Sequence, residues 1–221
     1  MIRSSSSQAH PVEQVRWSQL EAPVLRAVEV LVGGGVVVYP TETVYGIGTS
    51  LTVGDEGIER VRRAKGSPPG RPFLVLVDSL ERAFSLWSTV SPLARQLAER
   101  HWPGPLTLIA PAAKGLPEGL LGRVERDGEE LSTVSVRVPG DLRLTRLLRA
   151  LGAPLLSTSA NLKGEPPPVR FADVDVQALR PDLAIDAGAC VGGLPSTLVS
   201  VAGSEPMVLR QGELVIEEFE S

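Results

Sequence analysis

The chain has 221 residues, of which 43% are hydrophobic, and this content excludes wholesale disorder and fits one α/β domain. Its formal net charge of −4 argues against a protein that coats nucleic acid, and its single cysteine excludes an internal disulfide and a cysteine-based zinc site. No apolar run approaches 18 residues and no signal-like segment opens the chain, so we expect a cytoplasmic protein without export or a membrane span.

The first half of the chain predicts alternating helices and strands after a flexible tail. Serine-rich residues 1–15 are expected to form the tail, and residues 16–221 a single domain. The predicted elements are a helix from Pro23 that ends at the triple glycine 33–35, a buried strand at 36–39, a helix at 55–64, a strand at 73–77, two helices of which the second is capped by Ser91, a turn at 102–105 and a strand at 106–110.

The second half continues the alternation after a polar interruption. Residues 111–132 are rich in glycine and acidic groups and are expected to form a surface excursion. The elements predicted after it are a strand at 134–138, an amphipathic helix at 141–151, a strand from 155, a proline-rich loop at 165–168 and short strands at 184–186, 197–201 and 207–210. No repeat or linker divides this pattern, so an open sheet with flanking helices is expected.

Polar clusters follow several apolar strands, where ligands of open α/β sheets gather. In residues 39–46 an extended stretch with a period of two is expected to place Thr41, Thr43 and Tyr45 on one side. Their hydroxyls are suited to a small polar ligand, although threonine also simply favours strands. Ser157, Ser159 and Asn161 follow another strand in register, where they are suited to phosphate or ribose oxygens or to turn formation.

Two further segments carry basic side chains. Lys65 and Arg71 lie on a glycine- and proline-rich loop after the helix at 55–64, and this position suits them to phosphate groups, although basic residues also complement a helix C-terminus. The segment 133–138 alternates, so Thr133, Ser135 and Arg137 face away from three valines. An arginine in such a strand needs an anion, which is either a substrate carboxylate or an internal Asp or Glu.

Taken together, these motifs resemble one family. Tyr-Pro-Thr-Glu-Thr-Val-Tyr-Gly, the Lys-Gly loop, Trp-Pro-Gly-Pro-Leu-Thr, Val-Arg-Val-Pro, Ser-Thr-Ser-Ala-Asn and a late Pro-Ser-Thr occur in the order found in the family variously named YrdC, Sua5 or TsaC. The resemblance runs from about residue 22 to 212. In its length, the chain is similar to the short, single-domain members. It implies an open twisted mixed α/β sheet with flanking helices around a large concave basic cavity, and a single YrdC-like catalytic domain at 16–221.

The resemblance also implies an activity and a set of site residues. The family joins L-threonine, bicarbonate and ATP into threonylcarbamoyl-AMP and pyrophosphate, a nucleotidyltransferase reaction that supplies tRNA N6-threonylcarbamoyladenosine at position 37. The implied threonine contacts are Thr43, Arg137, Ser157 and Ser196. The implied ATP contacts are Lys65, Arg71, Thr133, Ser159, Asn161 and Arg210, of which Lys65, Arg71, Ser159 and Asn161 are also the expected catalytic residues. Mg²⁺ is expected to arrive with ATP, with no metal site of the protein's own.

Three positions depart from the family pattern. Ser67 stands where members usually have a phosphate-binding arginine, Ser200 where an aspartate is common after the late Ser-Thr, and Leu76 where a histidine or polar group sometimes occurs. The first departure bears on ATP binding. The alternatives are a double-stranded RNA-binding module of the same fold and a carbamoyl-adenylate-forming relative with another substrate. Expected partners are the small substrates and a transient hand-over to a tRNA-modifying threonylcarbamoyl transferase complex, with at most weak RNA binding.

Overall fold

A computed structural model describes residues 12–17, 21–216 and 219. The α-helices are α1 Ala22–Val32, α2 Asp55–Lys65, α3 Leu80–Ser85, α4 Pro92–His101, α5 Leu142–Leu151 and α6 Val176–Leu179, and short 3-10 turns span Leu51–Val53, Glu118–Leu120 and Phe171–Asp173. The strands are β1 Glu13–Arg16, β2 Val37–Tyr39, β3 Gly46–Ser50, β4 Leu74–Leu76, β5 Leu106–Pro111, β6 Gly122–Arg126, β7 Glu129–Arg137, β8 Leu155–Ser159, β9 Leu183–Asp186, β10 Thr197–Ser200 and β11 Met207–Arg210.

The described strands form one mixed sheet in the order β1-β9-β2-β3-β8-β4-β7-β5-β10-β11, with β6 added as a hairpin on β7. β4 and β10 run parallel to β7 and β5, whereas β3 and β8 pair antiparallel with each other. This topology confirms the expected open mixed α/β sheet with flanking helices.

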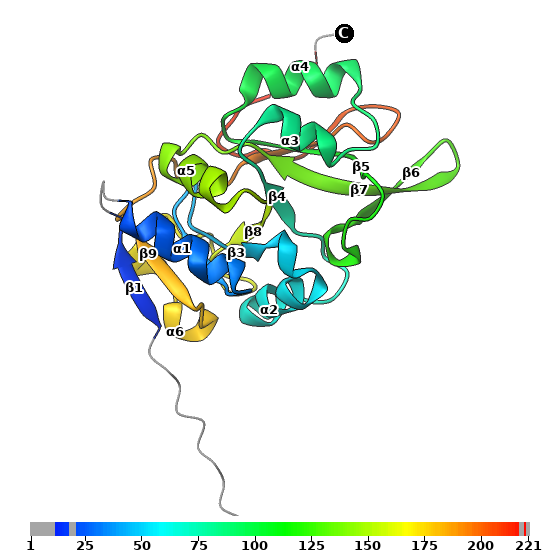
Figure 1. Cartoon of the computed structure of the whole chain (residues 1–221). Helices are drawn as coiled ribbons and strands as arrows, with labels where there is room; N and C mark the ends of the chain where they lie inside the picture. Colours follow the sequence, from blue (N-terminus) through cyan, green and yellow to red (C-terminus); the bar gives the residue numbers. More distant parts are fainter. Residues whose placement is uncertain (1–11, 18–20, 217–218, 220–221) are drawn as a thin grey trace, which may run out of the picture.

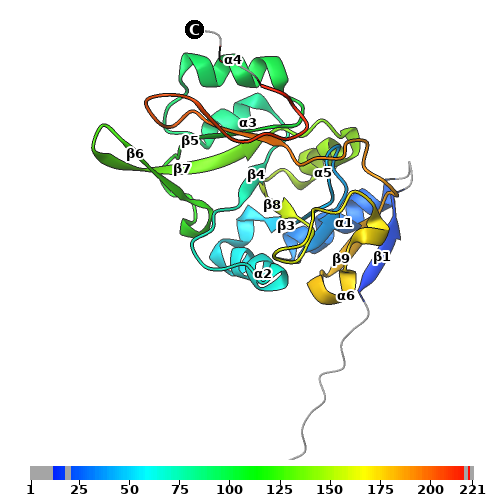
Figure 2. The same ribbon diagram turned by 180° about the vertical axis from the view of Figure 1, so that it is seen from behind.

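Helices cover the two faces of the sheet unequally (Figures 1 and 2). On one face α2, α3, α4 and α6 pack over a large apolar cluster that includes Ile58 of α2 and Ala98 of α4. On the other face α1 and α5 lie side by side over a smaller cluster, to which Leu31 and Leu148 contribute. This second face is covered only in part, which leaves room for the cavity described below.

The register of the strands shows where that cover ends. A row of paired residues crosses the partly covered face through Leu183, Val37, Gly48, Ser157, Leu74 and Ser135. Leu183 and Val37 belong to the apolar cluster under α1 and α5, whereas Ser157 and Ser135 line the cavity. Because residues paired across strands point to the same face, one continuous surface changes from apolar to polar along the row.

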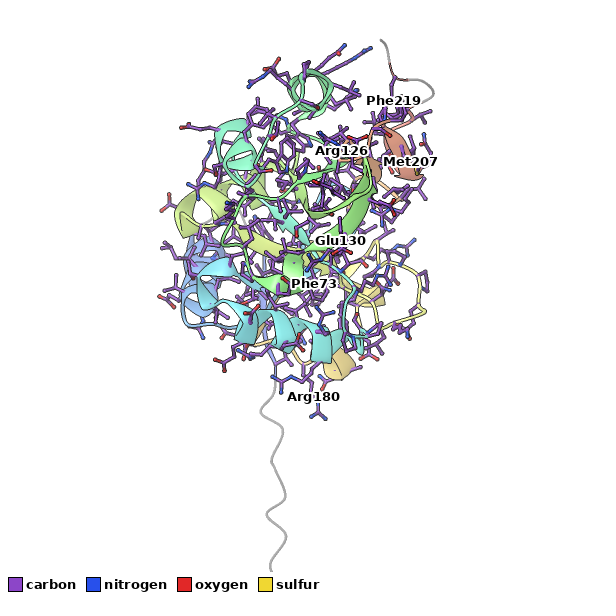
Figure 3. All side chains as sticks on the ribbon, turned by 90° about the vertical axis from the view of Figure 1, so that its right-hand side faces the viewer. Phe73, Arg126, Glu130, Arg180, Met207 and Phe219 are labelled. Atoms are coloured by element: carbon purple, nitrogen blue, oxygen red, sulfur yellow. The ribbon has the colours of Figure 1, made fainter. Side chains whose placement is uncertain are left out.

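The segment 111–132 lies largely at the surface, as predicted, but the prediction did not include the strands of its second half, where β6 and the start of β7 form a hairpin. Arg126 pairs with Glu129, and the two residues between them, Asp127 and Gly128, have φ values of 56° and 81°. A two-residue Asp-Gly loop of this conformation fits the twist of a hairpin. Arg126 and Glu130 mark the hairpin in Figure 3. The Asp-Gly pair was the signal that predicts the turn, and the polar strands around it concealed it.

The expected tail also needs a correction at its C-terminal end. Residues 13–16 form β1, which pairs in parallel with β9 from Glu13↔Leu183 to Arg16↔Asp186. The chain therefore enters the sheet before residue 16. Residues 1–11 lie outside the described residues, so the tail remains a prediction there. β1 escaped sequence reasoning because an edge strand with half-exposed polar residues lacks an apolar pattern.

Candidate functional site

A cavity of about 370 Å³ opens on the uncovered half of the partly covered sheet face. Its floor comes from strands β4, β5, β7, β8 and β10, and its walls come from the segments around residues 41–46, 71–73 and 195–196 and from β11. The polar residues that line it are Thr41, Thr43, Tyr45, Arg71, Thr107, Ser135, Arg137, Ser157, Thr158, Ser159, Ser196 and Arg210. A concave site of this size with converging polar groups is typical of a small-molecule site.

The four residues expected to contact threonine all line this cavity. Thr43, Arg137, Ser157 and Ser196 come from four separate segments of the chain. Each of them is at most 4% exposed. Hydroxyl and guanidinium groups held at this burial are oriented by their protein neighbours, which reduces the entropy that a ligand must remove.

Arg137 is fixed by three acceptors. Its Nε donates to the carbonyl oxygen of Gly104 at 3.0 Å, its Nη1 to Oγ1 of Thr43 at 3.2 Å and its Nη2 to Oε1 of Glu42 at 2.6 Å. Of the two anions that the sequence left open, the structure shows the internal one, which Glu42 supplies. A guanidinium has five N–H donors, so two remain beyond these three contacts.

Glu42 belongs to the site although sequence reasoning did not select it. Its Oε1 also accepts from the backbone N–H of Gly140 at 2.6 Å, whereas its buried Oε2 has no hydrogen-bond partner in the described residues. Its position in Tyr-Pro-Thr-Glu-Thr between two cavity threonines was the available signal. Glu42 therefore accepts from Arg137 through one carboxylate oxygen and one Nη, and the pair is not bidentate.

The segment from Pro40 to Tyr45 bends, so the expected extended stretch is wrong. Oγ1 of Thr41 accepts from the backbone N–H groups of Thr43 and Val44, at 3.0 and 3.2 Å, and Thr41 and Thr43 also join their hydroxyls at 2.8 Å. Such local bonds compete with an extended backbone. As a result the Tyr45 hydroxyl donates to the carbonyl of Gly188 at 3.0 Å instead of joining the threonines, and burial raises the pKa of Tyr45 to about 12.

Two hydroxyl pairs complete the floor. Tyr39 donates to Oγ of Ser157 at 2.7 Å, and Oγ1 of Thr107 lies 2.8 Å from Oγ of Ser196. Arg210 donates twice to the carbonyl oxygen of Ser196, at 2.8 and 3.1 Å. Sequence reasoning missed Tyr39 and Thr107. Thr107 had a signal, since it is the polar residue in the otherwise apolar strand β5.

The residues expected to contact ATP separate into two groups. Arg71, Ser159 and Arg210 line the cavity, whereas Lys65, Thr133 and Asn161 do not. Lys65 lies behind the end of β8, where its Nζ donates to the carbonyl oxygen of Ser159 and lies 3.4 Å from Oδ1 of Asn161. Burial, together with the charge of Arg71, lowers the pKa of Lys65 to about 8.

Positive charge converges on the cavity. Arg71, Arg137 and Arg210 all line it, and burial together with the charges of Arg137 and Arg71 lowers the pKa of Arg210. Three guanidinium groups around one small volume create a potential that attracts an anion such as a carboxylate or a phosphate. The expected concave basic cavity is therefore confirmed.

The departures from the family pattern lie at different depths. Leu76 is 2% exposed and lines the cavity floor beside Arg137, its partner in β7. Ser67 and Ser200 do not line the cavity. Across the described ranges, no group of three or more His, Cys, Asp or Glu residues is arranged to hold a metal ion. None of the helices described is long and apolar enough to cross a membrane.

Comparison with known proteins gives relatives over most of the chain. The family model of the Sua5, YciO and YrdC proteins, described as "Telomere recombination", matches residues 29–212. The threonylcarbamoyl-AMP synthase of Pyrococcus abyssi (strain GE5 / Orsay) is 33% identical over 188 residues, which are 85% of this chain and 53% of that protein. The chain thus spans about half the length of the curated relatives it matches first.

Two solved structures share the architecture. P. abyssi Sua5 complexed with L-threonine matches with a TM-score of 0.80 and 30% identity, over 92% of this chain and 58% of that one. E. coli YciO matches with a TM-score of 0.79 and 29% identity, over 95% of this chain and 99% of that one. The first likeness connects the fold with an amino-acid ligand, and the second covers nearly the whole of both chains.

Proposed function

This chain belongs to the Sua5/YciO/YrdC family, and we propose from that membership that it is a nucleotidyltransferase that makes threonylcarbamoyl-AMP and pyrophosphate from L-threonine, bicarbonate and ATP. The observation that carries the proposal is the meeting of Thr43, Arg137, Ser157 and Ser196 in one cavity with the guanidinium groups of Arg71 and Arg210. The first four suit an amino acid, and the last two suit a polyphosphate.

In the proposed arrangement threonine lies on the floor of the cavity. Its carboxylate meets the two remaining N–H donors of Arg137 and the hydroxyl of Ser157, while Thr43 and Ser196 contact its polar groups. A serine substrate, which lacks the methyl group, is expected to be poorer by roughly 1–3 kcal/mol in kcat/KM.

ATP occupies the mouth of the cavity in this proposal. Arg71 and Arg210 neutralise the phosphates, and Ser159 supplies a hydroxyl to them. Lys65, Thr133 and Asn161 lie behind or beside this position, so their proposed role is to hold the ends of β7 and β8 in place or to reach ATP after a side-chain movement. Mg²⁺ enters as part of the Mg–ATP substrate.

The proposed chemistry needs no nucleophile from the protein. The free threonine amine either condenses with bicarbonate and releases water or adds to CO₂ and releases a proton, and both routes give a carbamate. A carbamate oxygen then attacks the α-phosphate of ATP, and pyrophosphate leaves. Catalysis then comes from positioning and from neutralising charge on the phosphates, both of which a small basic cavity supplies. The labile product is handed to a threonylcarbamoyl transferase complex that modifies tRNA, and the proposed location is the cytoplasm.

The test is the release of AMP and pyrophosphate from ATP across a panel of amino acids, with and without bicarbonate. We expect release only when L-threonine and bicarbonate are both present. Equal rates with L-alanine or without an amino acid would contradict the proposal. A preference for another amino acid would instead support the second candidate, a relative with a different substrate.

The double-stranded RNA-binding alternative is not favoured. The arginines that the site gathers line a cavity of about 370 Å³, which suits a small molecule, whereas a duplex needs an extended basic surface. RNA binding measured at two salt concentrations checks this point, because purely electrostatic binding collapses as salt rises.

A further inference from the structure

The buried ring of Tyr39 reaches the cavity wall by crossing a neighbouring strand. Tyr39 ends β2 and Ser157 lies in β8, and β3 separates these strands in the sheet. A Cβ atom at Gly46 would lie 2.7 Å from Cε2 of Tyr39, and one at Gly48 would lie 2.8 Å from its hydroxyl oxygen. Two positions of β3 without side chains therefore form the path of the ring to Ser157.

The bond at the end of this path has a defined direction. Tyr39 is 0% exposed, and its hydroxyl donates to Oγ of Ser157 at 2.7 Å. Burial raises the pKa of Tyr39 well above its ordinary value, so the phenol keeps its proton and remains a donor. A serine hydroxyl has one proton and two lone pairs, so the bond from Tyr39 occupies a lone pair and leaves the proton of Ser157 for another partner.

That partner is not found in the protein. Within residues 12–17, 21–216 and 219, no acceptor takes the proton of Ser157, and Ser157 lines the cavity. Arg137 lines the same cavity as Ser157, and its guanidinium offers only donors. This side of the cavity therefore offers N–H and O–H protons to a ligand acceptor such as a carboxylate.

We propose that Tyr39 is a positioning residue that holds Ser157 as a hydrogen-bond donor toward the substrate, and that this wall selects the carboxylate end of an amino acid. The inference rests on the proposed function for the identity of the amino acid, L-threonine. The inference goes beyond the proposed function because it assigns a role to Tyr39, a buried residue that contacts no ligand. That role is to make Ser157, which does contact the ligand, a hydrogen-bond donor.

The first measurement is the Kd of L-threonine in the absence of ATP, by titration calorimetry on the full chain. Tyr39→Phe keeps the ring and removes the donor, so Ser157 loses its fixed orientation, and we expect the Kd to rise about threefold to tenfold. Thr49→Val is the matched control, because its hydroxyl donates to the carbonyl of Gly35 at 2.8 Å, is equally buried and does not line the cavity. It should leave the Kd unchanged.

A double-mutant cycle separates positioning from a general loss of structure. If Tyr39 acts through Ser157, Tyr39→Phe should change the Kd less than about twofold in a Ser157→Ala background. The same pair should couple in urea unfolding, because Ser157→Ala leaves a buried phenol without an acceptor and Tyr39→Phe then removes that unpaired group. Kd effects that multiply fully in the double variant would overturn the inference.

The preference for L-threonine over L-threoninamide is a measurement that a purely structural role of Tyr39 would leave unchanged. L-threoninamide replaces the carboxylate by a neutral group that also donates, so the wild type should prefer L-threonine, and Tyr39→Phe should narrow that preference because a freed Ser157 can also accept. An unchanged preference would contradict the inference. If the wild type binds another amino acid but not L-threonine, the proposed function fails and the same variants are judged with that amino acid. If it binds none, both fail.

Discussion

One face of the sheet has two halves that differ in the side chains they carry and in what covers them. Under α1 and α5 the strands present Val37, Leu155 and Leu183, and all three are fully buried against the helices. On the same face, Ser157 of β8 and Ser135 and Arg137 of β7 line the cavity instead. The cavity is thus the continuation of a core surface whose side chains have become polar, which explains how a rigid sheet comes to hold ligand groups in fixed positions.

The covered half should break first when its packing is disturbed. Leu148 of α5 is 1% exposed, and Leu148→Ala should lower the free energy of unfolding by about 2–5 kcal/mol through lost contacts and a new cavity. Leu142 of the same helix is 76% exposed, so Leu142→Ala should cost less than about 0.5 kcal/mol. Urea denaturation measures both. Equal losses of unfolding free energy in the two variants would show that the buried side of α5 does not stabilise this half of the sheet.

The open half should instead lose function. Arg137→Lys keeps the charge, but its single amine cannot reach Gly104, Thr43 and Glu42 together. We expect the threonine KM to rise by a factor equivalent to about 2–3 kcal/mol, while the ATP KM stays nearly constant. Arg149→Lys, on the exposed side of α5, is the control. A folded Arg137→Lys protein with normal threonine KM would make Arg137 a structural partner of Glu42 only.

Residues at the rim of the open half should control ATP binding. Arg71 lines the cavity mouth, and Arg71→Ala should reduce activity at limiting ATP by about 1.5–3 kcal/mol, close to abolition in an ordinary assay. Arg63, an exposed arginine of α2 that does not line the cavity, provides the control substitution Arg63→Ala. Steady-state kinetics at saturating threonine decide between them, and comparable losses in the two variants would contradict the placement of the phosphates.

Lys65, at the back of the open half, should make stability depend on pH. Its pKa is lowered from 10.5 to about 8, so the unfolded chain holds the proton more tightly than the folded one between these values. Unfolding free energy should therefore rise with pH from about 8 to 10.5, by about 1–3 kcal/mol, whereas below pH 8 the cost of the buried charge is fully present. Lys65→Met should lack this component. Parallel pH profiles of the two proteins would rule it out.

Ser67→Arg should produce the smallest effect. It restores a basic residue on the loop that carries Arg71, and we expect a lower ATP KM or a higher kcat by about 1 kcal/mol. Ser67→Gln adds length without charge and serves as the control. A neutral Ser67→Arg together with a mild Arg71→Ala would mean that the phosphates bind elsewhere.

The sequence predicted the apolar part of this architecture well. Val37 and its neighbours form an uninterrupted apolar run, and α4 begins after the cap Ser91, whose hydroxyl accepts from the backbone N–H of Ala94. Such signals are local, so one chain segment suffices to recognise them. The β6–β7 hairpin and β1 were missed because exposed strands have no apolar face to reveal them.

The sequence predicted which residues line the site but not the hydrogen bonds between them. The motifs selected Thr43, Arg137, Ser157 and Ser196, which do meet in the cavity. The bend at Thr41 depends on a side chain that bonds to its own backbone, and the bond between Tyr39 and Ser157 joins residues 118 positions apart. Lys65 turns behind β8 for the same reason, since its partners come from the far half of the chain. Pairings of this kind arise only when the sheet has assembled.

The last wall of the cavity has a consequence for synthesis on the ribosome. β10 joins the sheet beside β5 and β11 follows it, so Ser196 and Arg210 are made 85 and 99 residues after the end of β5 at Pro111. A nascent chain that contains β5, β7 and β8 but not yet β10 and β11 therefore lacks these two cavity residues. Because β10 pairs with β5 and β11 pairs with β10, the complete cavity forms only after both late strands have been made.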